Sequence, residues 1–212
     1  MAATAPARRD PYAGSGPPPT LTRARILDAA ARLFYRRGIR AVSVDGVADS
    51  ASVTKVTVYK HFGSKDHLIA SCLHMLDDRF FTWFVTEVEK SSDDPTERLL
   101  AVFDVLDRWF RRRSFRGCAF INATVELAEP AHPAHAAAVA HKDRSRAYFR
   151  ELAVAAGVDH PDDVSDQWML LSEGATVTAL VEDDRDAARR ARKAAEALLA
   201  GARRRRPARC PS

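Results

Sequence analysis

Cysteine is scarce in this chain of 212 residues, which contains only Cys72, Cys118 and Cys210. An odd number of widely separated cysteines predicts neither a disulfide framework nor a zinc cluster. No apolar run approaches the roughly 18–20 residues that cross a bilayer. The first residues also lack the apolar core of a secretory signal. These absences indicate a reduced protein of the cytoplasm that does not use the membrane as a partner.

The residue patterns of common enzyme sites are missing as well. The sequence contains no glycine-rich phosphate loop, no Ser-His-Asp arrangement near a strand turn and no recognisable pair of catalytic carboxylates. We therefore expect no catalysis and no cofactor.

Three histidines invite a metal interpretation. His132 and His135 have the i, i+3 spacing that can chelate a metal on a helix, and His141 follows. However, Pro133 lies between the first two at a helix start, and no cysteine or carboxylate completes the set at a plausible spacing. Solvated helix ends are the favoured interpretation, and we expect no metal.

Charge is unevenly distributed, although the net charge is only +5. Residues 20–65 carry nine Lys or Arg against three Asp or Glu, whereas residues 66–202 carry seventeen against twenty-four. A basic segment attached to an acidic remainder suggests that the basic segment meets a polyanion. The alternative is charge merely scattered over solvated faces.

Apolar periodicity predicts an all-α fold between two tails. Residues 1–19, rich in Ala, Pro and Gly, and the basic residues 203–212 are expected to be disordered. The arginines of the second tail bind DNA phosphates or are simply solvated. Thr20 is a plausible cap of the first helix, and Ser43 of the second. Later helices are expected at 64–89, 95–113, 117–128, 161–181 and 185–201, with one more ended by Gly157.

The segment TKVTVYKHF, residues 54–62, is rich in β-branched side chains, which favour strands. A strand here would have no partner, and a lone strand is not stable. As a helix, the segment has a cap in Thr54 and buries Val58 and Phe62 on one face. A helix ending near residue 51, a short turn and this second helix form a helix-turn-helix, whose second helix enters the major groove.

Residues 20–68 resemble the DNA-binding domain of the tetracycline-repressor (TetR) family of bacterial transcriptional regulators. The matching segments are RARILDAAARLFYRRG, SVDGVADSASVT and TVYKHFGSKDHL. The resemblance implies an all-α homodimer, with a three-helix DNA-binding domain at 20–65 and an effector-binding and dimerisation domain at 66–202. Family members usually have Gly in the turn and often in the recognition helix, where this chain has Ser52 and Val56. The operator sequence therefore cannot be transferred.

The resemblance also assigns DNA contacts position by position. Lys55, Val56 and Thr57 would face base edges, with Val56 against a thymine methyl group. The residues expected at phosphates, which fix the register without reading sequence, are Ser43, Tyr59, Lys60, His61 and Lys65. Ordinary surface packing is the alternative for Tyr59 and His61.

Small and apolar residues form a stripe on each of the last two helices. The positions are Leu170, Gly174, Val177 and Val181, then Ala187, Ala191, Ala194 and Leu198. Two such helices from each subunit would form a four-helix dimer interface. An intramolecular core is the alternative.

A polar row in the helix expected at 117–128 marks a candidate effector site. Cys118, Asn122 and Glu126 are spaced i, i+4, i+8 and share one face. A buried polar row costs free energy unless something pairs with it, either neighbouring groups or a ligand. Because small-molecule sites combine aromatic walls with a few polar groups, the further expected lining is Phe80, Trp83, Phe84, Phe103, Trp168 and Met169. A satisfied interhelical contact, a solvent-facing row or a redox role for Cys118 are the alternatives.

The sequence thus predicts a ligand-responsive regulator, in the family's usual form a repressor. It would bind double-stranded operator DNA with palindromic half-sites as a homodimer and be released by an unidentified small molecule. The alternative is a helical DNA-binding protein without an effector.

Overall fold

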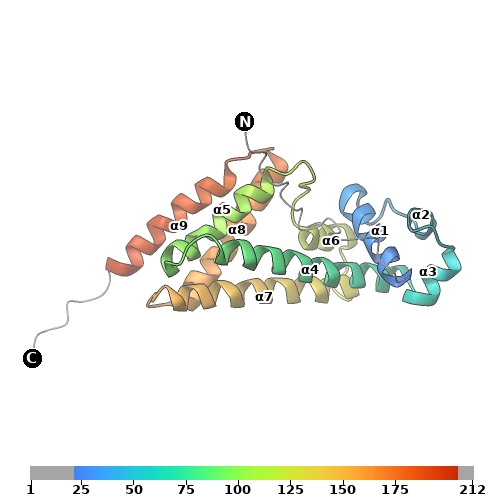
Figure 1. The fold of residues 1–212 in the computed structure, drawn as a ribbon, viewed down its shortest axis with the longest axis horizontal. Helices are drawn as coiled ribbons and strands as arrows, with labels where there is room; N and C mark the ends of the chain where they lie inside the picture. Colours follow the sequence, from blue (N-terminus) through green and yellow to red (C-terminus); the bar gives the residue numbers. More distant parts are fainter. Residues whose placement is uncertain (1–21, 205–212) are drawn as a thin grey trace, which may run out of the picture. The chain divides into compact units, whose positions relative to one another are not determined.

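The computed structural model describes residues 22–204, which fold into nine α-helices with no strand among them. In chain order these are α1 (Thr22–Arg37), α2 (Val44–Ser50), α3 (Lys55–Phe62), α4 (Lys65–Glu89), α5 (Pro95–Phe110), α6 (Ala119–Leu127), α7 (Pro133–Ala155), α8 (Pro161–Val181) and α9 (Ala187–Arg204) (Figure 1). The predicted all-α fold is confirmed. No helix within the described part of the chain is long and apolar enough to cross a membrane. The predicted cap Thr20 and residues 205–212 of the basic tail lie outside the described residues, as does the tail at 1–19.

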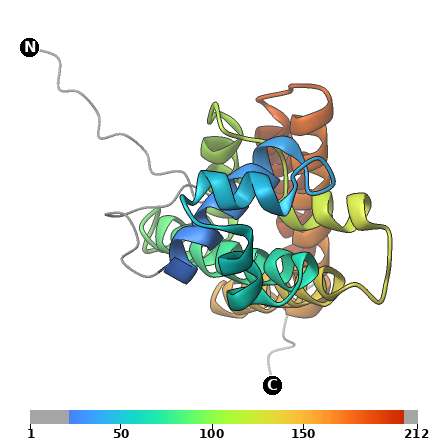
Figure 2. The ribbon, with the colours of Figure 1, turned by 90° about the vertical axis from the view of Figure 1, so that its right-hand side faces the viewer.

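The described helices divide into two compact units. The first comprises residues 22–83 and 119–138, which include α1, α2, α3 and α6 and the first part of α4 (Figure 2). The second comprises residues 84–118 and 139–204, which include α5, α8 and α9. This division places α6 and the first part of α4 with α1, α2 and α3.

α3 is helical despite its β-branched residues. Thr54 is its N-cap, and the hydroxyl oxygen accepts a hydrogen bond from the Thr57 N–H at 3.2 Å. Val58 and Phe62 are 1% and 7% exposed. Gly63, with φ 74°, ends the helix as a left-handed residue. Burial of two side chains and a cap therefore outweigh weak helix propensity over these two turns, as predicted.

Two contacts hold α1 against α4 inside the first unit. The buried Asp28 carboxylate binds the Arg79 guanidinium at 2.6 Å. A carboxylate removed from water needs such a partner, so the pair fixes how the two helices meet. The Cys72 thiol donates to the Leu27 carbonyl at 3.8 Å, and burial raises the pKa of this thiol well above its ordinary value. Cys72 is therefore a packing residue rather than a reactive thiol.

The core of the second unit is built around Trp168 on α8, whose side chain is fully buried. Its ring centroid lies 5.7 Å from that of Phe103 on α5. The indole N–H donates to the Leu99 carbonyl at 3.0 Å, so the one polar group of this side chain is satisfied. Apolar burial and this hydrogen bond together join α8 to α5.

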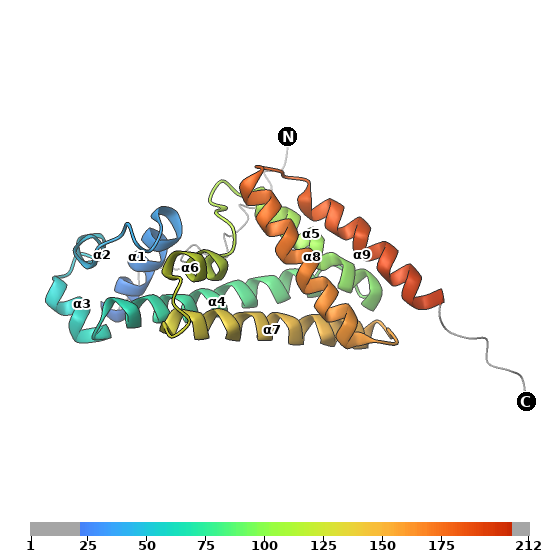
Figure 3. The ribbon, with the colours of Figure 1, turned by 180° about the vertical axis from the view of Figure 1, so that it is seen from behind.

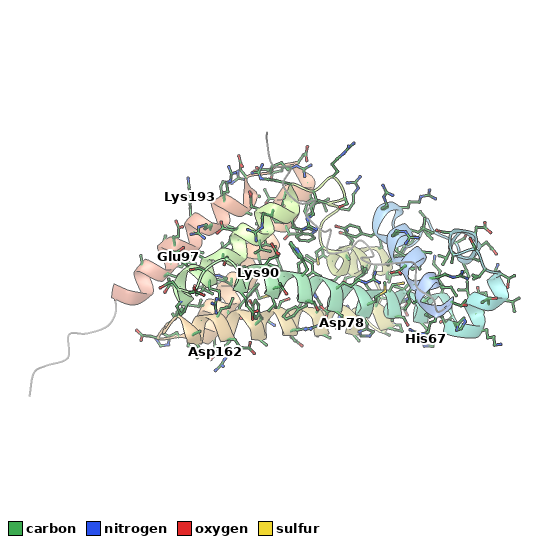
Figure 4. All side chains as sticks on the ribbon, viewed as in Figure 1. His67, Asp78, Lys90, Glu97, Asp162 and Lys193 are labelled. Carbon is green, nitrogen blue, oxygen red and sulfur yellow. The ribbon has the colours of Figure 1, made fainter. Side chains whose placement is uncertain are left out.

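Three ion pairs join α7 to α8 within the second unit. In order along α7 they are Lys142–Glu173 at 2.8 Å, Arg146–Asp166 at 2.7 Å and Arg150–Asp162 at 2.6 Å. The basic residues are four apart and share one face, while their partners run in the opposite direction, so the two helices are antiparallel. Figure 4 labels Asp162 at the start of α8. Each half-exposed pair contributes at most about 1 kcal/mol, and their combined effect is on register.

α9 lies beside α5 and α8, as Figures 1 and 3 show from opposite sides. Arg192 of α9 binds Asp104 at 2.7 Å and Glu97 at 3.1 Å, both on α5. Glu97 and the exposed Lys193, next to Arg192 on α9, are labelled in Figure 4. These ion pairs lie on the side of α9 that faces α5.

Candidate nucleic-acid interface

The helix-turn-helix consists of α2, a turn at residues 51–54 and α3. Ser43 caps α2 as predicted, because its hydroxyl oxygen accepts the Gly46 N–H at 3.1 Å. Ser52 has φ 53°, a region that non-glycine residues seldom adopt, so the backbone of the turn is strained at this residue. The Val53 N–H donates to the Ala48 carbonyl at 3.0 Å. This bond fixes the direction in which the chain enters α3.

One face of α3 is open to solvent. Val56 is 77% exposed and Tyr59 40% exposed, and Lys55, Lys60 and His61 are exposed as well. An apolar side chain among cations suits the major groove, where a thymine methyl lies close to hydrogen-bond acceptors and phosphates. The face therefore has the chemistry for both base and backbone contacts.

Two residues predicted to read base edges are already engaged inside the protein. The Thr57 hydroxyl lies 2.9 Å from that of Thr54, and Thr57 is half-buried. The Lys55 ammonium donates to the Asp45 carboxylate of α2 at 2.8 Å, which raises the pKa of Lys55. An ammonium has three N–H donors, so Lys55 keeps two for another acceptor. Val56 is the most accessible of the three predicted base-reading side chains.

Lys65, predicted at a phosphate, has a structural contact. Its ammonium donates to the Ile39 carbonyl at 2.9 Å, in the loop between α1 and α2. A substitution of Lys65 would therefore disturb the loop as well as any phosphate contact. Ser43, by contrast, uses its oxygen as a cap acceptor and retains its hydroxyl proton for a phosphate.

Glu126 of α6 binds the same loop. Its Oε2 accepts the N–H of Ile39 at 2.7 Å and of Arg40 at 3.1 Å. Gly38, with φ 86°, lies directly under the carboxylate, and a Cβ there would come within 3.1 Å of Oε2. The carboxylate is therefore paired with backbone, which is the interhelical alternative to a ligand. A cationic effector at Glu126 would first have to displace two N–H donors.

The other predicted effector residues are divided between the two units. Asn122, Phe80 and Trp83 belong to the first; Phe84, Phe103, Cys118, Trp168 and Met169 belong to the second and are each more than nine-tenths buried. Cys118 has a basic neighbour that sequence reasoning did not identify, because the Lys142 ammonium lies 4.0 Å from its sulfur. Effector contact by these residues stays a prediction.

The predicted dimer stripe on α8 is exposed. Leu170, Val177 and Val181 are 72%, 43% and 76% exposed, and nothing lies within 4 Å of a Cβ built on Gly174. These positions form one uncovered apolar face of the described chain, which we call the α8 face.

The predicted stripe on α9 needs a correction. Ala187 and Ala191 are 3% and 8% exposed inside the second unit, so the intramolecular alternative holds for them. Ala194 and Leu198 are exposed. All four positions share one side of α9 by their spacing, but the first two are covered inside the second unit and the last two are exposed.

His132 and His141 are buried, so they are not the solvated helix ends that the sequence suggested. The His132 Nδ1 accepts the Ala134 N–H at 3.0 Å, and its Nε2 lies 3.3 Å from an Asp66 oxygen. His132 therefore joins the start of α7 to the start of α4, both within the first unit.

Known proteins are similar to this chain in sequence and in fold. A model of the bacterial regulatory proteins of the tetR family matches residues 26–72, which contain α2, the turn and α3. The HTH-type transcriptional regulator YjdC of Escherichia coli is 25% identical over 183 residues, 86% of this chain and 96% of its own. The HTH-type transcriptional repressor KstR2 of Mycobacterium tuberculosis is 33% identical over 81 residues, 38% of this chain and 40% of its own.

A solved structure extends the similarity over most of the chain. The crystal structure of a TetR-family transcriptional regulator from Streptomyces coelicolor superposes with a TM-score of 0.78 at 32% identity. The match covers 85% of this chain and 95% of that protein.

The contact between Glu126 and the loop gives a first prediction. Glu126→Ala leaves the Ile39 and Arg40 N–H groups without their charged acceptor and should lower the free energy of unfolding by about 1–3 kcal/mol. Glu126→Gln keeps a neutral acceptor and should lose less. Urea unfolding measures both. Glu129→Ala, at an exposed carboxylate two residues after α6, is the control and should change stability by less than about 0.5 kcal/mol. Equal losses for Glu126→Ala and Glu129→Ala would contradict the contact.

Proposed function

Because this chain belongs to the TetR family of bacterial regulatory proteins, which are DNA-binding transcriptional regulators and not enzymes, we propose that it is an effector-responsive repressor. It binds a palindromic operator as a homodimer and leaves the operator when a small molecule binds. The observation that carries this proposal is the solvent-open face of α3, with Val56 among the cations Lys55 and Lys60.

The proposed DNA contacts follow from the accessibility of each side chain. In the major groove, Val56 packs on a thymine methyl group, and Lys55 donates to a base acceptor beside it. Lys60, Tyr59 and His61 contact phosphates, which hold the helix in place on any sequence. Thr57 contributes to base contact only if its hydroxyl turns away from Thr54.

The proposed homodimer rests on the α8 face. Leu170, Val177 and Val181 would lose much apolar exposed surface on pairing, and Gly174 allows close approach of two helices. The exposed Ala194 and Leu198 of α9 would extend this surface. In a two-fold dimer the α3 helices bind half-sites about 34–36 Å apart, one turn of the duplex. That geometry is the reason for proposing a palindromic operator.

The proposed response to a small molecule rests on family membership and on the effector candidates predicted above. An effector changes operator affinity only if it binds one conformation better than the other. The alternative, a DNA-binding protein without an effector, predicts that no small molecule releases the operator.

Selection of duplexes from a random pool tests DNA recognition, and two variants test the division of contacts. Val56→Ala should relax preference at one base pair of each half-site, by roughly 1 kcal/mol, with little change in salt dependence. Lys60→Ala should weaken binding to all sequences alike. It should also lower the slope of log affinity against log salt concentration by about one unit per protomer. Failure of the pool to enrich any sequence would refute the proposed function, and equal loss of discrimination in both variants would refute the division.

The dimer is tested by placing a charge on the α8 face. Val177→Glu should raise the dimer dissociation constant at least about 30-fold, because a buried apolar anchor is typically worth 2 kcal/mol or more. Sedimentation velocity at micromolar concentration measures the change. The control is Val154→Glu, at a 52% exposed valine of α7 outside this face. A wild-type monomer, or equal dissociation of both variants, would exclude this interface.

The effector is tested by screening small molecules for release of the selected duplex. A compound that releases the wild type should require a higher concentration with Asn122→Ala, by roughly tenfold if one hydrogen bond is lost. Val125→Ala alters the exposed side of α6 and should respond like the wild type. If Asn122→Ala also responds like the wild type, the effector site lies elsewhere.

A further inference from the structure

Lys55 and Asp45 form an ion pair across the helix-turn-helix. Lys55 is the first residue of α3, Asp45 lies in the first turn of α2, and the Nζ–Oδ2 distance is 2.8 Å. Their side chains are 50% and 61% exposed. An ion pair this exposed contributes little to folding stability. Its location at the DNA-facing surface suggests a different effect.

The other acidic groups of this region do not compete for Lys55. Among residues 22–65, Asp28 is buried against Arg79, and Asp49 is exposed near the other end of α2. Tyr59, one turn along α3, is the other titratable group that acts on Lys55. Asp45 is therefore the carboxylate of this segment that engages a cation of the recognition helix.

Backbone phosphates are present on every DNA sequence, and nonspecific affinity rises with the number of phosphates that a protein neutralises. A lysine that already binds a carboxylate releases fewer counterions when it approaches DNA, because its charge is partly compensated beforehand. Two N–H donors of Lys55 nevertheless stay available for a base acceptor. The Asp45 contact thus weakens the binding of Lys55 to phosphates, which does not depend on DNA sequence, more than it weakens a hydrogen bond from Lys55 to a base.

We propose that Asp45 is a positioning residue for DNA specificity: its carboxylate holds the Lys55 ammonium at the first turn of α3 and withholds it from backbone phosphates. This inference rests on the proposed entry of α3 into the major groove. Removal of the carboxylate frees Lys55 for any phosphate within reach, so the protein binds arbitrary DNA more tightly and discriminates less.

The test measures binding of the full chain to two duplexes of equal length, one of random sequence and one enriched from the random pool. Asp45→Asn should raise affinity for the random duplex about two- to fivefold per protomer. It should also steepen the salt slope by up to about one unit per protomer. Affinity for the enriched duplex should rise less, so the ratio of the two affinities falls. Asp45→Ser, which also suits a helix start, should behave the same way.

Two matched variants separate this effect from a change in background charge. Asp49→Asn makes the same charge change on the same helix without touching Lys55 and should leave the affinity ratio unchanged. In a Lys55→Ala background, Asp45→Asn should have no further effect on affinity or salt slope, because the residue through which Asp45 acts is gone.

Equal shifts from Asp45→Asn and Asp49→Asn would overturn the proposal, as would an Asp45→Asn effect that persists in the Lys55→Ala background. Binding to the random duplex can be measured even if no sequence is enriched. Failure of the proposed function and failure of this inference therefore give different results.

Discussion

The placement of the helix-turn-helix depends on how the loop between α1 and α2 satisfies its backbone polar groups. Buried or half-buried N–H and C=O groups need partners, and this loop has no helix to supply them. Glu126 accepts the N–H groups of Ile39 and Arg40, Lys65 donates to the Ile39 carbonyl, and Gly38 leaves room for the carboxylate. Because α2 begins shortly after this loop, these charged side chains determine where α2, and through the turn α3, can lie.

The parts of this fold that the sequence predicts are those decided within a few residues. Thr54 and Ser43 cap their helices through an N–H three residues ahead, and Gly63 ends α3 in a left-handed conformation. The helix expected at 161–181 has the same bounds as α8, because Pro161 marks its first turn. Even the β-branched α3 was predictable, since the spacing of Val58 and Phe62 indicated which side would be buried.

The parts that the sequence did not predict are decided by partners far along the chain. The sequence shows Glu126 as a polar residue on a helix expected to be buried. The N–H groups that it binds are 87 and 86 positions away in the sequence, and a contact over that separation leaves no periodic signal. The sequence therefore leaves an effector, a satisfied interhelical contact and a solvent-facing row all open for Glu126. The spacing of Ala187, Ala191, Ala194 and Leu198 predicts one dimer stripe, but it carries no sign that the first two are covered inside the second unit and the last two are not. That difference depends on how α9 packs on α5, to which Arg189 and Arg192 both bind.

Ion pairs within the second unit bear on recognition through the field that they leave. In the second unit, basic residues of α7 form ion pairs with α8, and Arg192 of α9 forms one with α5. These pairs reduce the electrostatic field of the second unit in the surrounding solvent. At physiological salt the field of an exposed charge decays over about 8 Å. In the proposed complex, a duplex near α3 would respond to Lys55, Lys60 and their immediate neighbours rather than to the net charge of +5. On this proposal, discrimination between DNA sequences would come from the few side chains on the exposed face of α3 and from contacts that hold them in place, such as that of Asp45 with Lys55.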